Sequence, residues 1–220
     1  VWWVDLKNGN DDWAGSTEPT AFKTVHKALE SNSWNSGDTI KVKPSLASDG
    51  TLSYYDFKNE EINLNTSNNF VLIGTGGADS TIFDARNTNR HFTFDDGQSS
   101  ETIIKGITFK NGYADNWPGA GSIFLHRQLQ IQFIDCTWES NSTNGQEGGG
   151  AIIIREGATP SFTGCTFKGN YVNNTDGGND GGAVRIQWPD SKAELQATVK
   201  FKKTKFIDNY LKVKHSAYGG

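Results

Sequence analysis

The feature of this sequence that most restricts its fold is a repeat of about 30 residues. One phrase recurs as GITFKN, DCTWESN, GCTFKGN and KFIDN, and a second as GSIFL, GAIII and GAVRI. The aromatic residues of the first phrase are Phe109, Trp138, Phe167 and Phe206, spaced by 29, 29 and 39 residues. A unit this short cannot enclose a core alone, so consecutive units must stack on one another.

Each unit consists of short runs rich in Ile, Val, Phe and Thr between Gly, Asn and Asp, which is typical of strands and turns. In SFTGCTF, Phe162, Cys165 and Phe167 cannot all face inward on one straight strand, because side chains alternate. A corner at Gly164 removes the conflict, and Gly106 and Asp135 occupy the same place in other units. We therefore predict an all-β fold, a single-stranded right-handed parallel β-helix with three strands per coil and a loop after each Asn.

Stacking places equivalent residues in columns about 4.8 Å apart. We expect an asparagine ladder at one corner and an aromatic ladder inside the solenoid. Cys136 and Cys165 would lie in adjacent coils, as free buried thiols or as a disulfide, with free thiols favoured because parallel side chains point the same way. The expected ladders comprise Asn111, Asn141, Asn170 and Asn209, and Phe109, Trp138, Phe167 and Phe206.

The N-terminal part differs from the repeats. Residues 1–36 are expected to form a cap that includes a helix at about 21–31, and 37–220 to form the coils. Gly219-Gly220 ends the sequence where earlier units continue with a strand, so we expect the coils to continue past Gly220 in the parent protein. The chain begins at Val1 and contains no Met, which suggests a processed product.

The cap and first strands resemble those of pectin-lyase-like right-handed β-helix proteins, in WVDLKNGNDDWAGSTEPTAFKTVHKAL, GDTIKV, VLIGTGGADSTIFDA and TIIKGITFKNG. The units with GGA and CTF phrases are similar to the repeats of polymorphic outer-membrane adhesins. The resemblance covers nearly the whole chain and implies a secreted or cell-surface protein. It is specific for fold only, since this solenoid is used by lyases, hydrolases, adhesins and phage spikes.

Charge and hydropathy exclude some partners. The net charge is −4 and there is no basic stripe, so we do not expect nucleic acid to bind. No apolar run approaches the 18 residues needed to span a membrane. The N-x-S/T sequons at Asn65, Asn141 and Asn173 hint at export.

One lateral face is the best candidate for ligand binding. The repeat register aligns one set of outward residues, Asp95, His126, Arg155 and Gln187. A second set lies two residues earlier in the same strands and consists of Thr93, Phe124, Ile153 and Arg185. Arginine and histidine would bind the carboxylates or sulfates of a glycan, and Phe124 and Trp188 would offer flat surfaces to sugar rings. The alternative is a solvated ladder in which Asp95, His126 and Arg155 balance one another.

The rival function is that of a polysaccharide lyase acting on a uronate-containing glycan. Such an enzyme needs a base and a cation beside the uronate, and Arg155 or His126 would be the candidates. The only carboxylates expected nearby are Asp95 and Glu156, and no lyase signature is evident. A glycosidase would need a carboxylate pair across a groove, which does not recur between coils. We therefore favour a role without chemistry.

Two acidic loops are candidates for Ca²⁺, the only cofactor considered, because carboxylate and amide oxygens suit that ion. Turn residues of the same types are the alternative. The candidate ligands are Asp5, Asn10 and Asp12 in the first loop, and Asp176 and Asp180 in the second.

From the sequence we predict an extracellular structural or adhesive protein. Its partner would be a polysaccharide or cell-surface glycan, bound by the lateral face or the loops. An open C-terminal coil would also allow head-to-tail self-association, because its backbone groups are unpaired.

Overall fold

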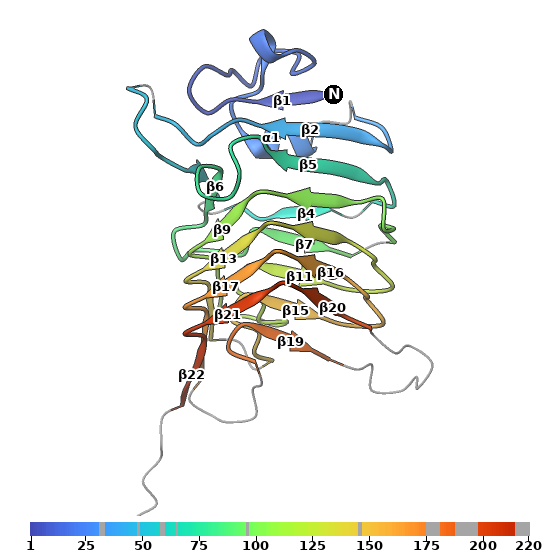
Figure 1. Ribbon diagram of the computed structural model, residues 1–220, viewed down its shortest axis with the longest axis vertical. Helices are drawn as coiled ribbons and strands as arrows, with labels where there is room; N and C mark the ends of the chain where they lie inside the picture. Colours follow the sequence, from blue (N-terminus) through green and yellow to red (C-terminus); the bar gives the residue numbers. More distant parts are fainter. Residues whose placement is uncertain are drawn as a thin grey trace, which may run out of the picture.

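The fold is known from a computed structural model, which describes residues 1–30, 34–47, 49–57, 60–64, 66–95, 97–144, 147–174, 181–187 and 198–213. These residues form four parallel β-sheets, in each of which the strands of successive coils stack along one long axis (Figure 1). The chain passes from sheet to sheet and returns one coil further along. The molecule is a β-solenoid with one short α-helix among the described residues, which confirms the predicted fold class.

We number the sheets in the order in which a coil visits them. In the described residues, sheet 1 contains β1 (Trp2–Val4), β2 (Asp38–Val42), β5 (Phe70–Gly74), β8 (Ile103–Lys105), β12 (Gln132–Ile134), β16 (Ser161–Thr163) and β20 (Lys200–Lys202). Sheet 2 contains β3 (Tyr55–Asp56), β6 (Ile82–Asp84), β9 (Thr108–Lys110), β13 (Thr137–Glu139), β17 (Thr166–Lys168) and β21 (Lys205–Ile207). Sheet 3 contains β10 (Tyr113–Ala114), β14 (Ser142–Thr143), β18 (Tyr171–Asn174) and β22 (Tyr210–Val213). Sheet 4 contains β4 (Ile62–Leu64), β7 (Phe92–Phe94), β11 (Ile123–Leu125), β15 (Ile152–Ile154) and β19 (Val184–Ile186).

Sheet 3 was not predicted. The chain does not enter a loop directly after each asparagine but first adds a short strand to this sheet. Three of these strands begin with Tyr followed by Ala, Val or Leu, but β14 is Ser-Thr, and a pattern of two residues is too short to indicate a strand. Their pairing therefore depends on the coils being stacked, which is a tertiary effect that local pattern does not encode.

The N-terminal end is closed by the cap. Helix α1 (Val25–Glu30) lies within the predicted span, and the Thr24 hydroxyl accepts a hydrogen bond from the Lys27 amide at 3.1 Å. Strand β1 precedes the expected start of the coils at residue 37 and pairs with β2. The outer edge of β1 is bonded to the segment that includes the 3-10 turn η1 (Glu18–Thr20). In it, Trp3 N–H donates to Gly15 O and Phe22 N–H donates to Trp3 O, at 2.8 and 2.9 Å.

The sharp corner between sheets 1 and 2 is present, as predicted. Gly106, Asp135 and Gly164 have φ values of 65°, 51° and 68°, and Lys203 takes the same left-handed conformation in the last coil. Phe162, Cys165 and Phe167 on the two sides of Gly164 are all fully buried. The left-handed residue at the corner thus allows the inward side chains of both strands to point into the same core.

The aromatic ladder is confirmed. The ring centroids of Phe109 and Trp138 lie 5.4 Å apart, those of Trp138 and Phe167 4.7 Å, and those of Phe167 and Phe206 4.9 Å. A second aromatic ladder extends inward from sheet 1. It consists of Phe133, Phe162 and Phe201, with distances between ring centroids of 5.1 and 5.0 Å. All five contacts are stacked, so the rings of successive coils pack face to face.

The asparagine ladder contains Asn141, Asn170 and Asn209 but not Asn111, so the prediction for Asn111 is wrong. The paired strands align Phe109 with Trp138, which places Gly112 opposite Asn141. The Gly112 amide donates to Asn141 Oδ1 at 2.7 Å. Asn111 instead stands one residue earlier, at a second left-handed corner between sheets 2 and 3, with φ of 53°, and its side-chain amide donates to Asp84. The cause is the position of the asparagine and not a missing residue. Asn111 follows Phe109 by two residues, whereas Asn141 follows Trp138 by three, while Tyr113 and Ser142 still pair at the same spacing.

Each ladder asparagine links two neighbouring coils. Asn170 Oδ1 accepts from the backbone and side-chain nitrogens of Asn141, at 3.0 and 2.9 Å, and Asn170 Nδ2 donates to Trp138 O at 2.9 Å. Asn209 repeats the pattern below Asn170. Because Asn141 and Asn170 are fully buried, each of these bonds replaces contact with water at the turn.

Glycines mark a second close contact, just before the strands of sheet 4. A Cβ atom on Gly121 would lie 2.1 Å from Gly150 O, and one on Gly150 would lie 2.1 Å from Gly182 O. Glycine is thus required here because successive backbones touch, which explains the repeated glycine before these strands.

His91 is the one fully buried histidine among the described residues. Its Nε2 lies 3.0 Å from Phe83 O and its Nδ1 lies 3.0 Å from the Ser122 hydroxyl, which suits the neutral ring as donor to the first and acceptor from the second. Desolvation by burial lowers the pKa of His91 to about 3.

None of the described helices is long and apolar enough to cross a membrane.

We predict that Asn170→Ala lowers the free energy of unfolding by about 3 kcal/mol or more, because it leaves buried groups of Asn141 and Trp138 without partners. Urea unfolding at neutral pH measures the loss. Asn173→Ala is the matched control, since Asn173 makes an exposed bond to Asn144, and its cost should stay within about 0.5 kcal/mol. Equal losses for the two variants would contradict a structural role for the ladder.

We also predict that stability falls as the pH drops below about 6.5, the pKa of histidine in an unfolded chain. Because the folded pKa of His91 is about 3, the unfolded state binds a proton that the folded state does not, and the loss reaches about 2 kcal/mol at pH 5. Urea unfolding at pH 7.5 and pH 5 measures it. In His91→Gln the difference between these two pH values should shrink; an unchanged difference would show that His91 is not its source.

Candidate functional site

The register of the predicted face is confirmed. Thr93, Phe124, Ile153 and Arg185 are paired with one another across sheet 4. Asp95, His126, Arg155 and Gln187 each stand one residue after the last pair of their strands. Alternation then brings the side chains of both columns to the outer side of the sheet.

His126 lies between two carboxylates. Its Nδ1 is 2.5 Å from Asp95 Oδ1 and its Nε2 is 3.0 Å from Glu156 Oε1. Arg127, which the sequence analysis did not single out, approaches Asp95 at 3.4 Å. Both ring nitrogens thus face a carboxylate oxygen, and Arg127 places a positive charge beside Asp95.

Arg155 does not join that group but pairs with Glu147, at 3.1 Å between Arg155 Nη1 and Glu147 Oε2. Glu147 also receives hydrogen bonds from Arg185, at its backbone oxygen, and from Gln187 at 3.4 Å. The guanidinium of Arg155 lies over the ring of Trp117, 5.1 Å from its centroid. The contacts therefore match the charge-balance alternative, with Glu147 in place of Asp95 as the partner of Arg155.

The face is not open and flat, because the segment before β11 covers part of it. Phe124 is only 5% exposed and forms a small apolar cluster with Ala120 and Ile153. Trp117 packs against Phe124, with centroids 6.3 Å apart, and is itself 64% exposed. The exposed ring on this side is therefore Trp117 rather than Phe124, while Trp188 lies outside the described residues.

Sequence reasoning missed Glu147 and Trp117 because both lie in segments of variable length between the repeated phrases. Trp117 could have been noticed as a lone aromatic residue before Pro118 in a segment rich in small residues. Nothing in the repeat pattern singles out Glu147, whose role depends on how its segment folds back over sheet 4.

A polar groove lies beside the start of sheet 1. It has a volume of about 520 Å³ and is lined by Ser100, Gln130, Gln132, Thr159, Ser161, Thr198 and Lys200. The pairing of β12, β16 and β20 aligns Gln132 with Ser161 and Ser161 with Lys200. Gln130, Thr159 and Thr198 stand two residues earlier in the same coils. Consecutive coils thus repeat the same pair of outward positions along the axis of the solenoid.

This groove was not predicted, although a signal exists. In the coils of β12, β16 and β20 a polar residue directly precedes the inward phenylalanine of sheet 1, in Gln132-Phe133, Ser161-Phe162 and Lys200-Phe201. Taken alone this is the alternation of any half-buried strand. Only the stacking of the coils shows that these residues and the preceding turns form one continuous surface.

The first candidate calcium loop is held together by protein contacts. Asp5 accepts hydrogen bonds from the amides of Lys7 and Asn8 and pairs with Lys43 at 3.0 Å. Burial favours a higher pKa for Asp5, but these hydrogen bonds and the Lys43 ammonium outweigh it and lower the pKa. Asn10 accepts from the Asp12 amide. Within the described residues, no three His, Cys, Asp or Glu side chains gather as a metal site. Asp176 and Asp180 lie outside those residues, so calcium there stays a prediction.

The cysteines are free and buried in adjacent coils. Burial raises the pKa of the Cys136 thiol, and it raises that of Cys165 to about 11. A thiol that stays protonated in a dry core is a weak nucleophile, so both cysteines act as small apolar residues of the core.

No family model, curated protein or solved structure matches this chain.

Proposed function

We propose that this chain is the solenoid part of a secreted or cell-surface protein that binds a linear polysaccharide along its side without chemical turnover. The observation that carries this proposal is the polar groove that runs across successive coils beside sheet 1. The resemblance to pectin-lyase-like and adhesin β-helices supports an extracellular setting, and the sequon at Asn173, which is partly exposed, is compatible with it.

The chemistry of the groove supports a sugar ligand. Hydroxyl and amide side chains both donate and accept hydrogen bonds, as sugar hydroxyls do. Among the residues that line the groove, Lys200 is the only charged one, so an uncharged chain or one with a single nearby acidic group would fit best. A strongly anionic polymer finds little to bind there.

The spacing of the groove supports a polymer rather than a single sugar. Stacked coils repeat at about 4.8 Å, which is close to the length of one sugar unit in an extended chain. A polysaccharide parallel to the axis would therefore present each successive sugar to the same pair of positions, such as Gln130 with Gln132 and Thr159 with Ser161. Weak contacts of this kind add up along the chain.

The Trp117 side of the molecule supports a second contact. An exposed aromatic ring held in place by Arg155 and Phe124 is a rigid platform for the apolar face of a sugar. Arg127, which is 59% exposed, and Glu156, which is 42% exposed, flank His126 on the same face and offer planar hydrogen-bonding groups.

The alternative remains a polysaccharide lyase with Arg155 or His126 as the base. The contacts favour binding over turnover, because Arg155 is paired with Glu147 and both nitrogens of His126 face carboxylates. A base needs an available lone pair within reach of the substrate proton. Incubation with pectate, alginate and chondroitin, followed by the absorbance of unsaturated uronates, separates the two. Turnover that is lost in Arg155→Ala would overturn the proposal.

We predict that affinity for soluble oligosaccharides rises with chain length up to about four sugars and then levels off, because four coils line the groove. Calorimetric titration with length series from neutral and uronate-containing polymers measures this. Gln132→Ala combined with Ser161→Ala should weaken binding by roughly fivefold or more, the equivalent of one hydrogen bond.

The control is Thr137→Ala combined with Thr166→Ala, which removes two polar side chains from a neighbouring pair on sheet 2. This variant should bind like the parent chain. Length-independent affinity, or equal weakening in both double variants, would count against a groove that follows the coils.

A further inference from the structure

The outer face of sheet 1 changes in character along the molecule. The outward side chains of β16 and β20 are polar, as alternation predicts for strands with one face in water, and consist of Ser161, Thr163, Lys200 and Lys202. Those of β5 and β8 are mostly aliphatic and include Val71, Ile73 and Ile103. All these strands belong to one sheet whose inner face fills the core, so the difference concerns the outer face alone (Figure 1).

Strand β5 is apolar on both faces. Phe70 and Leu72 are fully buried in the core, whereas Val71 and Ile73 alternate with them and are half-buried on the outside. A run of this kind is typical of parallel strands that helices cover on the second face. The neighbours of β5 are β2 and β8 in its own sheet. The described helix α1 does not cover the outer face, because its buried residues belong to the core.

Strand pairing joins the outward aliphatic residues into one apolar patch, which consists of Val71, Ile73, Ile103 and Ile134. Val71 pairs with Ile103, and Ile134 stands one coil further along, beside Lys105. All four are half-buried. Single aliphatic residues are common on protein surfaces, but a contiguous group that spans three coils is typical of an interaction site.

Two lysines border the apolar patch. Ile73 pairs with Lys41 on one side and with Lys105 on the other, which places the two lysines two coils, or about 9.6 Å, apart. Lys41 lies over the ring of Trp3, 4.8 Å from its centroid, and Lys105 is exposed. The outward residues of β2, β5, β8 and β12 include no carboxylate. The patch therefore combines an apolar surface with two positive charges.

An acidic amphipathic helix matches both features. Its apolar stripe would cover the aliphatic side chains, as helices do on parallel sheets, and carboxylates beside the stripe would reach Lys41 and Lys105. Residues seven apart on a helix lie about 10.5 Å from each other along one face, which is close to the spacing of the two lysines. A helix parallel to the solenoid axis can thus contact both lysines at once.

Other occupants fit this face less well. A second copy of the chain placed face to face would bring lysines opposite lysines. A bilayer favours apolar side chains that stand out from the surface, whereas Val71 and Ile73 are half-buried between neighbouring strands of a sheet. A polysaccharide rich in hydroxyl groups would leave the aliphatic side chains without an apolar partner.

We propose that the outer face of β2, β5 and β8 is a docking site for an acidic amphipathic helix of a partner protein. The apolar patch provides affinity, and the two lysines select a helix with acidic flanks. The polar groove lies further along the same sheet, beside β12, β16 and β20. The proposal therefore does not depend on glycan binding.

The test uses a fluorescent helical peptide of about 15 residues with a leucine stripe and, beside it, glutamates seven residues apart. Fluorescence anisotropy against the whole chain should show saturable binding that weakens with added salt. Two matched peptides should bind at least roughly tenfold more weakly. One has lysines in place of the glutamates, and the other has the same composition with its leucines spread around the helix.

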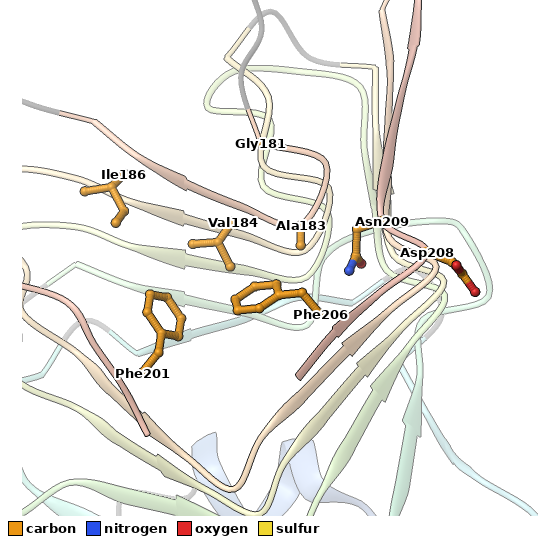
Figure 2. A pocket seen from close by; sticks show the side chains of 8 residues that line it. All are labelled: Gly181, Ala183, Val184, Ile186, Phe201, Phe206, Asp208 and Asn209. Carbon is orange, nitrogen blue, oxygen red and sulfur yellow. The ribbon is translucent and has the colours of Figure 1, made fainter. Parts of the chain in front are cut away.

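The charge selection has its own test. Lys41→Glu combined with Lys105→Glu should reverse the preference of the protein, so that the lysine peptide binds more tightly than the acidic one. The control is Lys202→Glu combined with Lys205→Glu, which changes the net charge equally. These lysines adjoin Phe201 and Phe206, whose rings point inward in Figure 2, and lie about 14 Å or more from Lys105, beyond the range of unscreened charge. The control should keep the preference of the parent chain.

The apolar contact is tested by Ile73→Ser, which should weaken binding of the acidic peptide by roughly fivefold or more. Because Ile73 is half-buried on the outer face, the midpoint of urea unfolding should change little. Equal binding of all three peptides, or no binding of the acidic one, would overturn the proposal. Binding to phosphatidylserine vesicles that Ile73→Ser abolishes would overturn it in favour of a membrane surface, and dimers in sedimentation velocity in favour of a second copy.

Discussion

The left-handed corner between sheets 1 and 2 is the constraint on which the rest of the structure depends. Without it, alternation would turn either Phe162 or Cys165 and Phe167 out of the core. With it, two short strands meet at an angle and both fill the same interior. The aromatic and asparagine ladders and the lateral groove all follow from coils that make this corner at the same place.

The corner also explains how much could be predicted from sequence. Phe162, Gly164 and Phe167 conflict with a straight strand, and one left-handed residue is the simplest solution, so the coil and its columns could be inferred before any coordinates. The same method failed at Asn111, which stands one residue before the ladder position, at the corner between sheets 2 and 3, and leaves Gly112 opposite Asn141. The assignment of residues to a column is reliable when it is counted from paired strands. It is unreliable when it is counted from similar sequence motifs.

The candidate sites show the limit of a repeat pattern. It located Asp95, His126 and Arg155 correctly in one column, where Asp95 contacts His126, but Glu147, the partner of Arg155, comes from outside the columns. The contacts of a charged side chain on a solenoid depend as much on the segment that folds over it as on its own register. The groove poses the opposite problem, because Gln132 and Ser161 are unremarkable in their own coils and form a surface only together.

The glycine column has a consequence for how such a molecule can change. Because Gly121, Gly150 and Gly182 touch the backbone of the next coil, a substitution at any of them disturbs two coils at once. Duplicating or deleting a complete coil keeps each glycine against its neighbour and preserves every ladder, since coils contact only those next to them. Inherited changes of length within the stack are therefore expected in steps of whole coils, while insertions of any size are tolerated in the segments between strands.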